Sequence, residues 1–111
     1  MTVDTDFRLV LCTCPDQESA NQIAERLVGD RLAACVSLLP GLTSVYRWQG
    51  AIQRETEVLL LIKTVADQFA ALAATLRGIH PYEVPEIIAL PITEGLDDYL
   101  NWITTCTQPD A

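Results

Sequence analysis

A strand that is apolar on both faces is the feature that most constrains this chain. Between Arg8 and Thr13 the sequence runs Leu-Val-Leu-Cys, without the polar alternation of a strand that has one face in water. The run stops at Cys14, because the following Pro15 lacks the amide that a sheet ladder needs. Such a strand needs a covering layer on each side.

A helix is predicted directly after this strand. Asp16 can accept hydrogen bonds from the free amides of a helix start, and Gly29 with Asp30 marks the helix end. Between them, apolar residues recur at the spacing that forms one buried helical stripe. They are Ala20, Ile23, Ala24, Leu27 and Val28.

A long bent hairpin is expected next. One strand covers residues 32–48, and Pro40 with Gly41 predicts a bulge or bend within it rather than a chain break. A turn at residues 49–50 leads into a return strand over residues 51–63. The hairpin is longer than a four-stranded sheet of this size needs, and unpaired strand edges invite pairing with other chains.

A second helix, a short strand and a third helix complete the predicted order. Thr64 with Asp67 resembles a capping box for a helix that ends at Gly78. Prolines on both sides delimit a strand over residues 86–90. An apolar stripe predicts a short amphipathic helix over residues 96–103.

The order of these elements predicts an α+β, ferredoxin-like βαββαβ fold with an extra C-terminal helix. Right-handed crossovers place both main helices on the same face of one sheet. The opposite face then stays uncovered within one chain, and at ~25 cal/mol per Å² its burial would contribute many kcal/mol. The sheet of another subunit is therefore the expected cover.

Composition and charge exclude several classes of protein. A formal net charge of −8 with seven scattered basic residues argues against nucleic acid as a partner. No apolar run reaches transmembrane length, so no membrane partner is expected. The first residues carry neither a basic nor an apolar signal region, which predicts a cytoplasmic protein whose four cysteines are free thiols.

The single histidine, His80, is the first candidate metal ligand. In the predicted sheet the start of the last strand lies beside the end of the first, so His80 should approach Cys12 or Cys14. A thiolate beside a neutral imidazole suits copper, mercury or zinc. The alternative is structural, because free cysteine is among the most buried residue types and behaves as a small hydrophobe.

Four segments of the chain resemble the CutA family of divalent-cation tolerance proteins, and the resemblance runs from about Leu9 to Ile103. They are Ala33-Ala34-Cys35-Val36, Tyr46-Arg47-Trp48-Gln49-Gly50, His80-Pro81-Tyr82-Glu83-Val84-Pro85-Glu86-Ile87-Ile88 and Tyr99-Leu100-Asn101-Trp102. The resemblance implies a trimer of ferredoxin-like subunits, similar to the PII signalling proteins, whose extended hairpins pair between neighbours. It also implies a copper-associated cysteine at Cys12 and a copper ligand at His80. Ile79 departs from the pattern, because some family members carry a further histidine near that position.

The expected function is that of a non-catalytic homotrimer in divalent metal tolerance, with Cu²⁺ or another divalent cation as candidate ligand and no required cofactor. We expect one CutA-like domain over residues 1–111, with an ordered core at about residues 8–105. No nucleophile elbow or protease signature favours an enzyme.

The alternative is a PII-like sensor that binds a small molecule in a cleft between subunits. Lys63, Tyr82, Glu83 and Glu86 are the residues expected to line such a cleft. The chain has neither the glycine-rich phosphate loop nor the basic cluster that a nucleotide needs.

Overall fold

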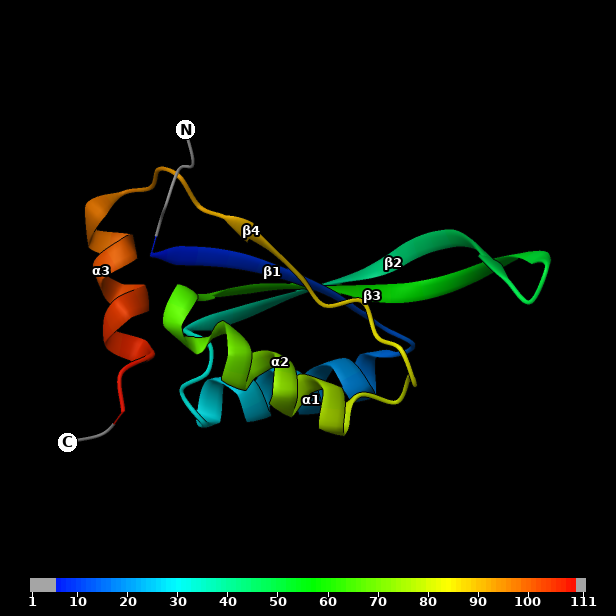
Figure 1. The fold of residues 1–111 in the computed structure, drawn as a ribbon, viewed down its shortest axis with the longest axis horizontal. Helices are drawn as coiled ribbons and strands as arrows, with labels where there is room; N and C mark the ends of the chain where they lie inside the picture. Colours follow the sequence, from blue (N-terminus) through cyan, green and yellow to red (C-terminus); the bar gives the residue numbers. More distant parts are fainter. Residues whose placement is uncertain (1–5, 110–111) are drawn as a thin grey trace.

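One antiparallel sheet organises the molecule, which a computed structural model describes over residues 6–109. The elements are β1 (Phe7–Cys14), α1 (Gln17–Gly29), β2 (Cys35–Trp48), β3 (Ala51–Val65), a 3-10 turn (Ala66–Gln68), α2 (Phe69–Ile79), β4 (Ile88–Pro91) and α3 (Asp97–Cys106) (Figure 1). The strand order β2-β3-β1-β4 confirms the ferredoxin-like α+β fold. Residues 1–5 and 110–111 of the expected domain lie outside the described residues.

The predicted bent hairpin is present as β2 and β3, and its far end extends beyond the rest of the sheet (Figure 1). The pairing register shifts between Leu39 and Leu42, where Gly41 has a φ of 84°. This irregularity is the predicted bulge. Gln49 and Gly50 both have positive φ, as a tight two-residue hairpin turn requires.

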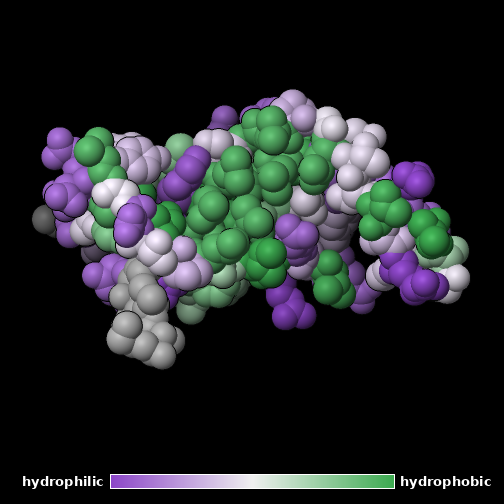
Figure 2. Space-filling view, turned by 90° about the horizontal axis from the view of Figure 1, so that it is seen from above, coloured by the Kyte–Doolittle hydropathy of each residue, from purple (hydrophilic) through white to green (hydrophobic). Residues whose placement is uncertain are grey.

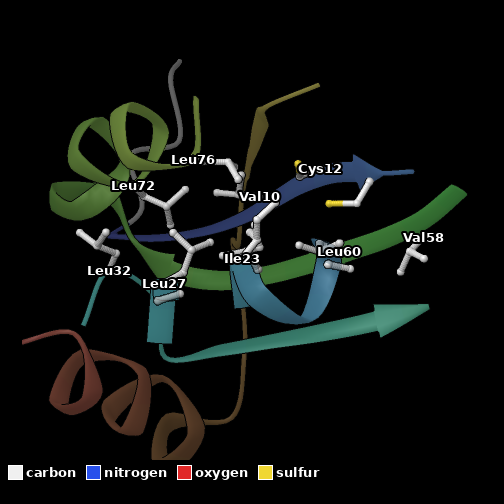
Figure 3. Close-up of a cluster of buried hydrophobic side chains, with 13 residues drawn as sticks. Val10, Cys12, Ile23, Leu27, Leu32, Val58, Leu60, Leu72 and Leu76 are labelled. Carbon is white, nitrogen blue, oxygen red and sulfur yellow. The ribbon is translucent and has the colours of Figure 1, made fainter. Parts of the chain in front are cut away.

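Helices α1 and α2 cover one face of the sheet and close the core between them (Figure 1). Alternate residues of β1 point to this face: Val10, Cys12 and Cys14 are fully buried. Figure 3 shows Val10 and Cys12 of β1 near Leu76 of α2 in the core, and further buried residues of the strands and helices complete the cluster. The helices therefore bury one of the two apolar faces of β1.

The opposite face of the sheet carries an uncovered apolar surface, as the sequence predicted. Figure 2 views the molecule from the side opposite α1 and α2, where hydrophobic side chains form one continuous area. The register assigns this open face the alternate residues of all four strands. Its apolar members include Leu9, Leu11, Leu39, Leu59, Leu61, Ile88 and Leu90, all partly or well exposed.

The start of α2 differs from the sequence prediction. Thr64 does not cap the helix: it lies in β3, and its hydroxyl donates a 2.6 Å hydrogen bond to the carbonyl of Leu32. Asp67 belongs to the 3-10 turn, and α2 begins at Phe69 after Gln68, whose side chain makes no cap bond. The strand runs further than its pattern suggests, because Thr64 is completely buried against the loop before β2.

Other helix and strand boundaries differ from the predicted ones by a few residues. Strand β2 begins at Cys35 instead of residue 32, and β4 begins at Ile88 instead of residue 86 and includes Pro91, which pairs with Arg8. The predicted cap of α1 is confirmed, since the amide of Ser19 donates to the Asp16 carboxylate at 2.8 Å. Over residues 6–109, no helix combines the length and apolarity needed to span a membrane.

Candidate metal centre

Two cysteines of β1 supply the sulfur atoms of the candidate site. Cys12 and Cys14 are two positions apart in an extended strand, so both side chains project to the helix-covered face. Both are 0% exposed, and both belong to the main hydrophobic core. Neither forms a disulfide. The core thus contains two free thiols at the end of β1.

His80 follows α2 directly, and the end of that helix positions it. Its amide donates to the carbonyl of Leu76 at 2.9 Å, and its extended backbone, with ψ at 139°, turns the chain out of the helix. The imidazole then reaches the end of β1, where Nε2 lies 2.8 Å from the carbonyl oxygen of Thr13. The side chain is 8% exposed, so the ring is nearly enclosed.

Hydrogen bonds define the protonation of the ring. The amide N–H of Tyr82 donates to Nδ1 of His80 at 3.0 Å, so Nδ1 carries no proton. Nε2 therefore carries the proton and donates it to Thr13. Both nitrogen atoms of the imidazole therefore have hydrogen-bond partners. A metal ion that bound Nε2 would replace this proton and its bond to Thr13.

The three donor groups of Cys12, Cys14 and His80 lie close enough to share one ion. Their ligand atoms are all within 4.8 Å of one another, and Sγ of Cys14 is 3.9 Å from Nε2 of His80. Two sulfurs and one nitrogen in an apolar pocket suit soft or borderline ions. The residues therefore fit copper or zinc by donor type.

The two thiols lie close enough to separate each other's acidities, while Sγ of Cys12 also lies 3.7 Å from the carbonyl oxygen of Thr13. Interaction with Cys14, together with burial, raises the pKa of Cys12 far above its ordinary value. The same interaction lowers the pKa of Cys14, although burial opposes it. Cys14 is thus the thiol that loses its proton first, and a metal would displace the second proton from Cys12.

Tyr82 connects this cluster to the long hairpin. Its ring lies 4.8 Å from that of His80 at an interplanar angle of 48°. Its hydroxyl donates a 2.7 Å hydrogen bond to the carboxylate of Glu57 in β3. Burial and this bond raise the pKa of Tyr82 above its ordinary range. The phenol therefore stays protonated and remains the donor.

The residues expected to line a sensor cleft do not meet within one chain. Lys63 lies on the open face, where Nζ donates to Ser37 at 2.6 Å and to Sγ of Cys35 at 3.8 Å. It is six positions along β3 from Glu57, the partner of Tyr82, which corresponds to ~20 Å of extended strand. Glu83 lines a shallow apolar groove against α2 instead.

Sequence reasoning named Cys12 and His80 as metal ligands and Cys14 as a possible neighbour of His80, and it gave no role to Glu57 or Thr13. Cys14 was predictable as a partner, since residues two apart in a strand share a face. Glu57 gave no such signal, because its partner Tyr82 is distant in sequence. Thr13 contributes only its backbone carbonyl, which carries no side-chain pattern.

The fold and the cluster define a ferredoxin-like α+β protein with a buried thiol and imidazole site. Comparison with known proteins agrees with the resemblance drawn from the sequence. The family model for the CutA1 divalent ion tolerance protein matches residues 8–106. The chain therefore belongs to the CutA1 family, which is named for divalent-cation tolerance and not for a reaction.

Curated relatives carry the same description. The divalent-cation tolerance protein CutA of Thermus thermophilus is 53% identical over 95 residues, which cover 86% of this chain and 92% of the relative. The protein of the same name from Yersinia pestis is 47% identical over 95 residues and is covered to 80%.

Solved structures share the fold over nearly the whole chain. CutA of Xylella fastidiosa aligns with a TM-score of 0.92 at 48% identity, over 94% of this chain and all of the other. A protein of Archaeoglobus fulgidus, described as a periplasmic divalent cation tolerance protein, aligns with a TM-score of 0.90 at 35% identity, over 92% of this chain and 99% of the other. One protein with this fold is therefore described as periplasmic.

Proposed function

We propose that this protein acts in divalent metal tolerance by binding copper, or another ion that accepts sulfur and nitrogen, through Cys12 and His80. The observation that carries the proposal is the cluster of two thiols and one imidazole within 4.8 Å. Cys14 joins the two residues expected from the sequence as a third donor. No catalytic step is part of the proposal.

Binding at this site must release protons. The thiols carry two, and Nε2 of His80 carries one that now bonds to Thr13. Each ligand binds the metal in its deprotonated form, so acid competes with the metal. Thiolate sulfur favours the softer ions, which ranks Cu⁺ and Zn²⁺ above Mg²⁺ or Ca²⁺. The burial of all three groups adds selectivity against ions that hold their water tightly.

The experiment is a titration of the metal-free protein with Cu²⁺, Cu⁺ and Zn²⁺ that counts bound ions per chain. We expect about one ion per chain with a midpoint in the micromolar range or tighter. Cys12→Ser and His80→Ala should each abolish or strongly weaken binding. Cys106→Ser is the matched control, because that thiol lies in α3, away from the cluster. Unchanged metal binding by both Cys12→Ser and His80→Ala would refute the proposal.

We also propose that the protein works as a homotrimer. The support is the open apolar face, which a single chain leaves in contact with water although the residues on it are mostly Leu and Ile. The family resemblance provides the number three. A second chain on this face would supply the missing cover of β1.

The proposed compartment is the cytoplasm. Four free cysteines, two of them in the core, suit a reducing environment. Fractionation of cells with an antibody to the protein tests this directly.

A further inference from the structure

Glu57 is a buried carboxylate that has no role in the proposed metal site. It is 7% exposed, and its charge lies at the base of the extended hairpin. Among the described residues, no cation forms a salt bridge with it. Burying an unpaired carboxylate is costly unless hydrogen bonds compensate. The hydroxyl of Tyr82, at 2.7 Å from Oε2, is the compensating side chain.

Tyr82 belongs to the segment that begins with His80. Residues 80–87, between α2 and β4, form no helix or strand. Two hydrogen bonds of Tyr82 hold this segment in place. Its hydroxyl donates to Glu57, and its backbone amide donates to Nδ1 of His80. Nε2 of His80 then bonds to Thr13 of β1. Most core residues around the two thiols belong to helices and strands, whereas this segment lies outside both.

We propose that Tyr82 and Glu57 form a latch that controls access to the thiols of Cys12 and Cys14. While the bond between them is intact, the phenol ring lies against His80 and holds the imidazole to Thr13. When the bond opens, the segment and His80 lose this support and the thiols become reachable from solvent. Tyr82 and Glu57 are positioning residues that touch no metal. Their role in metal entry rests on the proposed function, whereas their effect on thiol access does not.

The test measures the rate at which iodoacetamide alkylates each cysteine of the native protein, by mass spectrometry. Labelling of a buried thiol follows the fraction of time that its enclosure is open. Tyr82→Phe removes the donor and Glu57→Met removes the acceptor at similar length. Each should raise the rate at Cys12 and Cys14 by about 10-fold to 100-fold, the range for one charge-assisted hydrogen bond.

Three comparisons make the outcome decisive. Glu55→Gln is the matched control, because Glu55 is an exposed carboxylate on the same strand, and it should leave the rates unchanged. A denaturant titration of each variant is the second control: a loss of global stability large enough to explain the faster labelling would mean general unfolding and would overturn the latch. The Tyr82→Phe and Glu57→Met double variant should label no faster than the faster single variant, since both remove one interaction. Multiplied effects, or no effect, would also overturn it.

The same variants separate the latch from the metal proposal. If copper fails to bind the parent protein but the alkylation rates of Cys12 and Cys14 rise as expected, the latch is supported and the metal role is refuted. If copper binds but neither variant alters the alkylation rates, the metal role is supported and the latch is refuted.

Discussion

Leu11 of β1 lies directly opposite Leu61 of β3 on the face of the sheet that no helix covers. Ile88 of β4 pairs with Leu11 on its other side. This row of apolar side chains crosses the centre of the open face. The first strand therefore meets helices on one side, and on the other it presents the surface for which we propose a second chain.

Replacing Leu11 with Asp should block assembly. The new carboxylate would lie between Leu61 and Ile88 without a partner, and burying an unpaired charge is strongly unfavourable. Sedimentation should find a smaller, less stable species than the parent. Val28→Asp is the control, because Val28 lies on α1 and is already 42% exposed. A Leu11→Asp variant that stays assembled with parental thermal stability would show that the open face is not the interface.

Replacing Thr64 with Val tests the correction at the end of β3. The variant keeps the shape but leaves the buried carbonyl of Leu32 without its hydroxyl donor. The free energy of unfolding should fall by about 1–3 kcal/mol, the usual cost of an unsatisfied buried group. If Thr64 capped α2 instead, Asp67→Ala would cost a similar amount. We expect almost no effect from Asp67→Ala, measured in the same denaturant titration.

Acid should weaken the cap of α1. Hydrogen bonds from Ser19 hold the pKa of Asp16 below its ordinary value of 3.8, so the folded state favours the carboxylate. The stabilisation is present above that value and is lost as the pH falls through the lowered pKa. Asp16→Asn still caps the helix but does not titrate. Thermal melts of the two proteins between pH 2 and 6, in about half-unit steps, should therefore diverge only at the acid end; identical pH profiles would contradict the assignment.

The sequence was sufficient for the architecture because its signals are local. The unbroken apolar run before Cys14, the spacing of apolar residues after Asp16 and the bulge at Gly41 each describe neighbours along the chain. Their order then selects the ferredoxin-like sheet, and the sheet brings His80 to the end of β1.

The details that sequence reasoning missed depend on contacts between distant segments. Thr64 looked like a helix cap, but its hydroxyl reaches Leu32, which only the folded sheet brings near. The pairing of Tyr82 with Glu57 joins residues 25 positions apart and has no periodic signature. The occupied nitrogens of His80 depend on a backbone carbonyl and a backbone amide, which side-chain patterns do not encode.

The binding of a metal by the thiol and imidazole cluster is the central claim, and X-ray absorption at the copper edge of the copper-loaded protein tests it most directly. We expect sulfur scatterers at about 2.3 Å, as in zinc thiolates, together with one imidazole nitrogen at about 2.0 Å. Cys12→Ser should reduce the sulfur signal. A spectrum with only oxygen and nitrogen neighbours, unchanged in Cys12→Ser, would show that the thiols do not bind the metal.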